Sequence, residues 1–192
     1  WNPQLAASAA KITAKRLEAV QKFNMLANLM QRRISGNEEN LSLSYQIKGM
    51  ENGQLAENME IWYNEMLHGL NNEEIYRGVT CVGPHRDDII VSVNGINLKS
   101  FGSQGQQRTA VLSMKLSELE FIRSETGEYP VLLLDDVMSE LDAGRRQQLL
   151  NFIEREGIQT LITATDEAYF QQAPLKTYFQ VEAGQVKVVN KV

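Results

Sequence analysis

The stretch Val131-Leu132-Leu133-Leu134-Asp135-Asp136 is a run of four apolar residues that ends in two acids. A continuous apolar run of this length predicts a strand that is buried on both faces of a parallel sheet. Acids at the carboxyl end of such a strand lie at the edge where α/β sheets bind their ligands. The stretch therefore predicts an α/β fold with a candidate ligand edge at Asp135 and Asp136.

The segments around this strand complete a strand–helix–strand order, which is typical of an α/β layer. A helix is predicted over 106–122, where leucines and an isoleucine repeat on one helical face, and a turn over 125–130. Residues 143–155 are predicted to form the next helix and 159–163 a second buried strand. Two hairpins are predicted further out, over 89–98 around Asn94-Gly95 and over 179–188 around Ala183-Gly184.

The first 77 residues are predicted to form a helical domain with a possible short strand, and residues 78–192 the α/β part. Ser35-Gly36-Asn37 is expected to end the first helix, and alternation over 41–47 predicts the strand. The apolar stripe of the first helix contains Leu5, Ala9, Ile12, Val20, Phe23, Ala27, Met30 and Ile34. A second helix is predicted over 54–70 from Leu55, Met59, Trp62, Met66 and Leu70.

Composition places the chain among ordinary globular proteins. It has 192 residues, of which 43% are apolar and 22% charged, and it has no apolar run long enough to cross a bilayer. With one cysteine (Cys81) and two histidines, an internal disulfide is impossible and a Cys/His zinc site is excluded. We therefore expect a cytoplasmic protein without a membrane segment.

The charge of the chain is distributed unevenly. Residues 1–33 carry six bases against one acid, a net charge of +5, although the whole chain has a net charge of −5. Residues 34–77 carry eight acids against two bases. The basic first helix is compatible with an anionic partner, and a solvated helix face is the alternative.

Four stretches contain polar residues where a phosphate or a metal could bind. Asp135 could hold Mg²⁺ and Asp136 could orient a water molecule, or one acid could cap the following helix. Ser103-Gln104-Gly105-Gln106 could bind an anion at a helix start, or Ser103 could be a simple N-cap. Ser139-Glu140-Leu141-Asp142 and Thr163-Ala164-Thr165-Asp166 follow in order, with Asp142 as a helix cap and a polar turn as the respective alternatives.

Taken together and in this order, these stretches resemble the second half of an ABC-type ATPase head. Ser103 to Gln106 resembles the signature loop, Asp135 and Asp136 the end of Walker B, and 139–142 the D-loop. Thr165 stands where a transporter has its switch histidine. The runs Gly83-Pro84-His85-Arg86-Asp87-Asp88 and 102–109 look like those of the RecF family of bacterial recombination-repair ATPases. The resemblance covers the whole chain and is specific over 79–166.

Two departures qualify this resemblance. The second acid is Asp136 where the general ABC pattern has Glu, which fits RecF and implies slow hydrolysis, as Thr165 does. The sequence contains no Gly-x-x-x-x-Gly-Lys-Ser/Thr, the loop that cradles phosphates. We therefore expect the chain to be the C-terminal part of a longer protein whose other part holds this loop.

The resemblance implies a head that binds ATP and Mg²⁺ and forms an ATP-dependent homodimer on double-stranded DNA near single-stranded gaps, working with RecR, RecO and RecA. It implies catalytic roles for Asp136 and Thr165 and a metal ligand in Asp135. Nucleotide contacts are expected from Ser103, Gly105, Gln106 and Asp142. DNA contacts are expected from Lys11, Lys15, Arg16, Lys22, Arg123, Arg145 and Arg146. A non-catalytic interaction module and a structural head of the SMC type are the alternatives. The role of Arg86 stays open between a nucleotide or DNA contact and a pair with Asp87 or Asp88.

Overall fold

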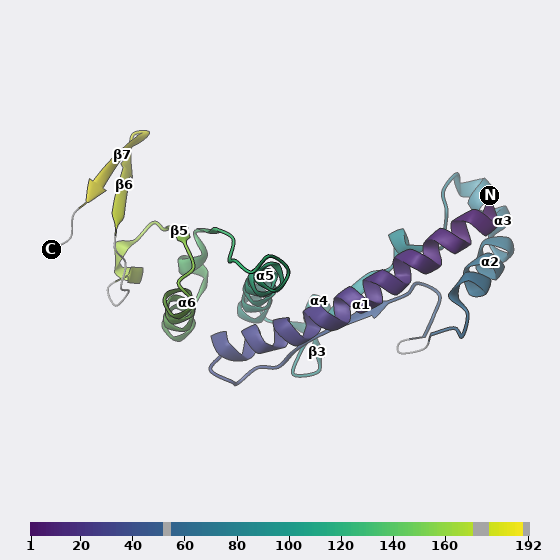
Figure 1. Ribbon diagram of the computed structural model, residues 1–192, viewed down its shortest axis with the longest axis horizontal. Coiled ribbons are helices and arrows are strands. Elements are labelled where there is room, and N and C mark those ends of the chain that lie inside the picture. The colour runs from purple at the N-terminus through teal and green to yellow at the C-terminus, as the bar shows by residue number, and fades with distance from the viewer. Residues whose placement is uncertain (52–54, 171–176, 190–192) are drawn as a thin grey trace.

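A computed structural model describes residues 1–51, 55–170 and 177–189 of the chain. The molecule is elongated (Figure 1): the N-terminus lies at one end beside α2 (Met59–Gly69) and α3 (Asn71–Arg77), and the hairpin β6–β7 lies at the other. The 33-residue helix α1 (Asn2–Ile34) runs from the first end into the middle of the molecule. No helix among the described residues is long and apolar enough to cross a membrane.

Helix α1 contributes to three separate hydrophobic cores. Near its start, Ala6 and Ala9 pack with Tyr63, Leu67 and Val82. In its second half, Ala27 packs on the strands and on α5 (Gln104–Thr126), and in its last two turns Met30 and Ile34 join the largest core. The predicted stripe is therefore right at Ala9, Ala27, Met30 and Ile34 and wrong at Leu5 and Ile12, which are about half exposed.

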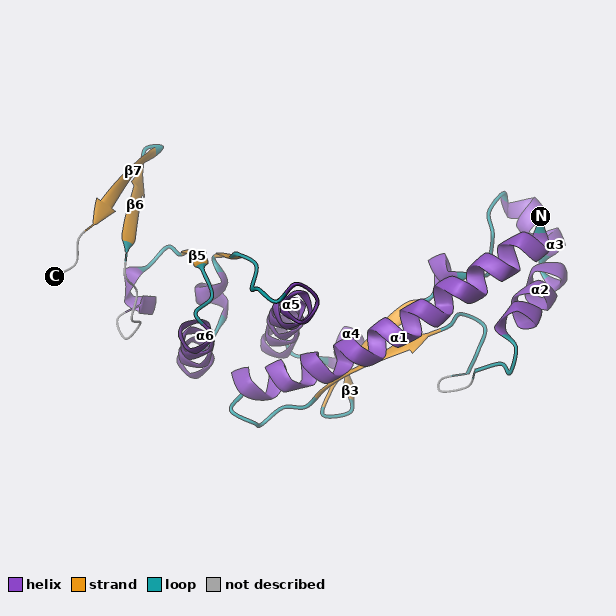
Figure 2. Ribbon diagram, viewed as in Figure 1, coloured by secondary structure: helices purple, strands orange, loops and turns teal. Residues whose placement is uncertain are grey.

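The first sheet contains β1 (Leu41–Gln46), β2 (Asp88–Val93) and β3 (Ile96–Asn97), all antiparallel (Figure 2). The hairpin prediction is confirmed, since Asn94 and Gly95 both adopt positive φ angles, as a type I′ turn requires. Helix α1 closes the outer edge of β1: Asn24 and Asn28 accept the N–H groups of Leu43 and Leu41 at 2.7 and 3.0 Å. Leu98 begins the short helix α4 (Leu98–Phe101) instead of continuing the strand.

The second sheet contains β4 (Leu132–Asp135) and β5 (Thr160–Thr163), which pair in parallel as predicted. Helix α6 (Ala143–Glu156) connects them after the 3-10 turn η2 (Val137–Glu140). Leu132 and Leu134 enter the largest core together with α5 and α6. The predictions of a strand buried on both faces at 131–134 and of a second buried strand at 159–163 are wrong for this chain. Leu133 of β4 is 70% exposed, and Leu161 of β5 is 55% exposed.

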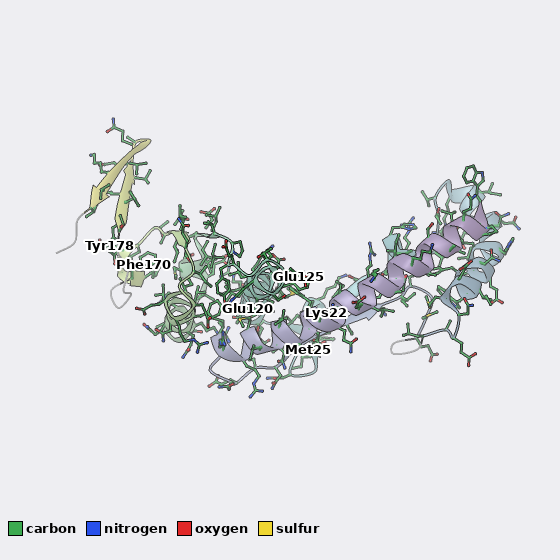
Figure 3. All side chains as sticks on the ribbon, viewed as in Figure 1. Lys22, Met25, Glu120, Glu125, Phe170 and Tyr178 are labelled. Carbon is green, nitrogen blue, oxygen red and sulfur yellow. The ribbon has the colours of Figure 1, made fainter. Side chains whose placement is uncertain are left out.

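The last elements are η3 (Glu167–Phe170), β6 (Tyr178–Glu182) and β7 (Gln185–Val189), and the predicted closing hairpin is confirmed. Phe170 and Tyr178 lie at the base of this hairpin (Figure 3), where both pack on the largest core. Two helices begin elsewhere than predicted: α5 begins at Gln104, and α2 begins at Met59 behind the cap Asn58. In α2 the fully buried residues are Tyr63 and Leu67, whereas Trp62 and Met66 are partly buried.

The division into 1–77 and 78–192 stays a prediction, and the structure shows many contacts across it. Strand β1 pairs with β2 along its whole length. Met30 and Ile34 of α1 share a core with Leu116 of α5. The η1 turn (Pro84–Arg86) also packs against α1, through the guanidinium of Arg16 and the carbonyl of Pro84.

Candidate functional site

The two acids at the end of β4 are joined to the end of β5 by one hydroxyl group. Asp135 and Thr163 are partners in the parallel register. The Thr163 hydroxyl donates to Asp135 Oδ1 and accepts the N–H of Asp136 at 3.0 Å. Asp136 has a left-handed backbone (φ 50°), a conformation that Asp tolerates better than most residues. The acid pair therefore lies at the sheet edge, as predicted, with both residues held by Thr163.

Thr163 belongs to the candidate stretch 163–166, but the sequence did not predict its own role at the site. The prediction named Thr165 from the resemblance, and Thr165 lies two residues beyond the strand, exposed to solvent. The sequence did carry a signal for Thr163. If the four-residue strands 132–135 and 160–163 pair in parallel from their first residues, their last residues, Asp135 and Thr163, lie side by side.

We expect Thr163→Val to destabilise the chain by about 1 kcal/mol, because it leaves the Asp136 N–H and the Asp135 carboxylate without this partner. Thr163→Ser should restore most of the loss. Chemical denaturation measures both variants, with Thr160→Val as the control, since the Thr160 hydroxyl bonds only locally to the Ile158 carbonyl. Equal midpoints for Thr163→Val and Thr160→Val would contradict the role given to Thr163.

The predicted signature loop is the N-terminus of α5, and Ser103 is its N-cap. The Ser103 hydroxyl accepts the Gln106 N–H at 3.2 Å, and the Gln106 side-chain oxygen accepts the Ser103 N–H at 3.1 Å, which is a capping box. The N–H of Gln106 is therefore engaged inside the loop. Gly105 lies in the first turn, where backbone N–H groups have no acceptor within the helix, so its N–H is the better candidate for an anion.

The predicted D-loop lies between the acid pair and α6 and contacts helix α5 just after the signature loop. The Ser139 hydroxyl donates to the Asp136 carbonyl at 2.9 Å. Asp142 caps α6 by accepting the N–H of Arg145 at 2.9 Å, which is the alternative that the sequence left open. Glu140 lies 3.7 Å from the guanidinium of Arg108 in the first turns of α5. All these predicted stretches thus meet at one edge of the molecule.

Three arginines predicted to contact DNA have partners inside the chain. Arg146 donates to the carbonyls of Met138 and Leu141 and lies over the Tyr169 ring. Arg123 donates to the Tyr129 hydroxyl at 2.6 Å, and this bond is the main cause of the raised pKa of Arg123. Arg145 is only 20% exposed and has acceptors on three sides. For these three residues a structural role fits the geometry better than a DNA contact.

The bases of α1 differ in their partners. Lys15 and Lys22 point outward and both pair with Glu18, whose carboxyl pKa is lowered by these two lysines, Lys15 first. Arg16 instead donates to the Pro84 carbonyl and, at 3.4 Å, to the Tyr45 hydroxyl. Lys11 is exposed, so Lys11, Lys15 and Lys22 stay candidates for phosphate contacts.

The run 83–88 closes the far end of the first sheet. Asp87 accepts the Tyr45 hydroxyl at 2.6 Å and the Lys48 N–H at 3.0 Å. Burial, followed by the bond to Asp87, raises the pKa of Tyr45 to about 12 and keeps this tyrosine a donor. Arg86 donates to the Thr80 carbonyl at 3.0 Å, so it makes neither of the pairs with Asp87 or Asp88 that the sequence left open.

The donor set at the strand ends fits Mg²⁺ only as part of a nucleotide complex. Among the described residues, no group of three or more His, Cys, Asp or Glu side chains could hold a metal. Mg²⁺ in nucleotide sites is commonly held by one or two carboxylates together with substrate phosphates and water. Asp135, exposed and oriented by Thr163, offers one such carboxylate.

No protein-family model matches the chain. DNA replication and repair protein RecF of Halothermothrix orenii is 49% identical over 169 residues, which are 86% of this chain and 44% of that protein. The protein of the same name from Listeria monocytogenes serotype 4b is 44% identical over 189 residues, 96% of this chain and 50% of that protein. The chain thus spans about half the length of these relatives and aligns with their C-terminal half.

Two solved structures are similar in fold to this chain. The structure of the recombination mediator protein RecF with ATP in the RecFOR pathway matches with a TM-score of 0.78 and 34% identity, over 98% of this chain and 49% of that one. A structure from work on ATP-driven dimerisation and DNA-stimulated activation of SMC ATPases matches with a TM-score of 0.55 at 11% identity, over 92% of this chain and 87% of that one. The predicted fold class, the C-terminal part of an ABC-type ATPase head, is confirmed.

Proposed function

The chain belongs with the RecF proteins, to whose C-terminal half it corresponds in sequence and fold, and from this relationship we propose that it supplies the closing face of an ATP-dependent DNA-binding head. In this proposal two heads face each other with ATP between them. Ser103 and the Gly105 N–H of one head reach the γ-phosphate bound by the other head. ATP therefore links the dimer, and hydrolysis releases it.

The observation that carries this proposal is the convergence of four separated stretches at one edge. Thr163 joins the ends of β4 and β5, Ser139 ties the D-loop to Asp136, and Arg108 and Glu140 bridge the D-loop to α5. An exposed carboxylate suits the magnesium ion of the head's own nucleotide, and a helix N-terminus suits the phosphate of the nucleotide bound by the facing head.

Within this edge the predicted acids and Thr165 have proposed roles. Asp135 would hold Mg²⁺, whose charge would neutralise the phosphates when it is bound. Asp136 would orient the attacking water, with Thr165 beside it, and Asp142 would contact the nucleotide of the facing head. Because Asp136 is one methylene shorter than Glu, its carboxylate would be set back from the water, and we propose slow hydrolysis.

The face of the β4–β5 sheet that points away from the core carries exposed apolar side chains, which supports the proposal that another part of the head packs on it. Leu133 of β4 and Leu161 of β5, which are partners in the parallel register, are both more than half exposed, and Val131 just before β4 is half exposed. Apolar residues on neighbouring strands are normally covered, since burial stabilises a side chain of this size by about 1.5–3 kcal/mol. We propose that the part of the head that this chain does not include, with the phosphate-cradling loop, covers this face.

The partners in this proposal are double-stranded DNA near single-stranded gaps, RecR, RecO and RecA, in a cytoplasmic, nucleoid-associated setting. Similarity to RecF, which is a recombination mediator of the RecFOR pathway, supports them. Lys11, Lys15 and Lys22 would supply phosphate contacts along α1, and residues 1–77 would form the helical domain. The alternatives are an interaction module without catalysis and a structural head of the SMC type.

A titration of the chain with Mg-ATP tests whether nucleotide binding needs the half of the head that carries the phosphate-cradling loop. We expect binding weaker than the micromolar range, because the sequence has no phosphate-cradling loop and only the closing face is present. Isothermal titration calorimetry measures this on the 192-residue chain. The control is a protein in which this chain is joined to the N-terminal half of one of its RecF relatives. This joined protein should bind Mg-ATP. Low-micromolar binding by the chain alone would contradict the proposal.

A further inference from the structure

Beneath the signature loop lies a polar cluster centred on the guanidinium of Arg145. One terminal nitrogen donates to the Gly105 carbonyl at 3.2 Å and also contacts the Thr109 hydroxyl. The other terminal nitrogen donates to Glu39 Oε1 at 3.0 Å, and Nε lies 3.4 Å from Asp142 Oδ2. Arg145 therefore contacts the start of α5, the D-loop and the segment between α1 and β1 at the same time.

The other half of the cluster ties Glu39 to the last turns of α1. Gln31, which is fully buried, donates from its side-chain nitrogen to Glu39 Oε2 at 2.6 Å. The Ser35 hydroxyl accepts the Glu39 N–H at 3.1 Å. The carboxylate of Glu39 is thus shared between α1 and Arg145, which lies 106 residues further along the chain.

The burial of this pair makes its geometry strict. The side chains of Glu39 and Arg145 are 11% and 20% exposed, and Thr109 beneath them is fully buried. Loss of one partner from a buried ion pair leaves an uncompensated charge, so the two groups are strongly coupled. The planar guanidinium satisfies acceptors in three directions, which a lysine ammonium on a flexible stem does not reproduce.

We propose that Arg145 and Glu39 form a positioning pair that fixes the signature loop and the D-loop relative to the end of α1. A displacement of α1 would then shift Gly105 and Asp142 together, and the long helix would control the closing face. The inference rests on the proposed function for its consequence, ATP-dependent dimerisation. The coupling itself rests on the contacts alone.

The chain offers a matched control in the ion pairs of Glu156. Its carboxylate is 18% exposed and lies 3.4 Å from Arg123 of α5 and 4.0 Å from Arg33 of α1. Glu156 of α6 thus contacts α1 and α5, the two helices that the Glu39–Arg145 pair also contacts, at the other end of α5 and away from the signature loop. Glu39→Gln and Glu156→Gln are the same chemical change at comparable burial.

The first experiment measures amide hydrogen exchange in the full 192-residue chain, with thermal unfolding of each variant alongside. We expect Glu39→Gln to speed exchange about tenfold over 103–109 and 142–146, relative to the hairpin 178–189. Glu156→Gln should lower the unfolding midpoint without this local change. Arg145→Lys keeps the charge and should reproduce the effect of Glu39→Gln; it also replaces that variant if Glu39→Gln does not fold. Equal local changes in Glu39→Gln and Glu156→Gln, or none in either, would overturn the proposal.

The second experiment separates this inference from the proposed function. In a protein that joins the chain to the half found in its relatives, Glu39→Gln should reduce ATP-dependent dimerisation at least tenfold, and Glu156→Gln should not. If the unsubstituted protein does not dimerise with ATP, the proposed function fails and hydrogen exchange alone decides the coupling. If it dimerises and Glu39→Gln dimerises equally well, the positioning pair is wrong.

Discussion

Replacing Asp136 by Asn is expected to slow ATP hydrolysis about 100-fold or more while ATP binding persists, in a protein that joins this chain to its relatives' other half. The carboxylate that would orient water becomes an amide, and loss of a general base typically costs this much or more. Asp135 keeps its proposed metal contact, so the ATP-linked dimer should live longer. Light scattering gives the dimer lifetime, and phosphate release gives the rate.

The backbone at residue 136 makes Asn the informative substitution. Asp136 has φ 50°, and Asn tolerates this left-handed conformation as well as Asp does. Its N–H would still donate to Thr163. Alanine would add backbone strain of roughly 1–3 kcal/mol and mix a folding defect with a catalytic one.

Asp135→Asn serves as the contrasting variant. It should weaken Mg²⁺-dependent nucleotide binding itself, because the proposed metal ligand is changed, whereas Asp136→Asn should not. Unchanged phosphate release in Asp136→Asn would remove this residue from the mechanism. A similar loss of binding in both variants would contradict their separate roles.

Local sequence patterns predicted several strands and turns well. The run 131–134 and the segment 159–163 became parallel strands, and Asn94-Gly95 and Ala183-Gly184 became turns with positive φ angles. These features depend on residues close together in the chain. The acid pair followed directly, because the end of a parallel strand fixes which residues lie at the ligand edge.

The errors arose where distant segments decide burial. Helix α1 crosses three cores, so no single stripe describes its buried face, and Leu5 and Ile12 stay exposed. Charge alone did not distinguish a solvated arginine from one enclosed by carbonyl and carboxylate groups. Arg145 finds its carboxylate in Glu39, 106 residues away, and no local pattern carries that information.

Ser103→Arg is expected to abolish ATP-dependent dimerisation, tested in the same joined protein, with little effect on nucleotide binding by the single head. The loop does not face the head's own nucleotide in this proposal, and a bulky cation would replace a small hydroxyl at the closing face. Loss of the cap should cost about 1 kcal/mol of stability. Asn58→Arg is the matched control, because Asn58 caps α2 in a similar way, accepting the N–H groups of Glu60 and Ile61.

Ser103→Asp separates the capping role of Ser103 from its proposed role at the nucleotide. Asp is as good an N-cap as Ser, so the acceptor for the Gln106 N–H is kept and the thermal midpoint should stay near that of the unsubstituted protein. If Ser103 faces a γ-phosphate, however, the added carboxylate repels it, and dimerisation should fail as completely as in Ser103→Arg. Analytical ultracentrifugation with ATP, paired with a thermal melt of each variant, measures both effects. A Ser103→Asp protein that dimerises normally would mean that the loop 102–105 is only the start of a helix.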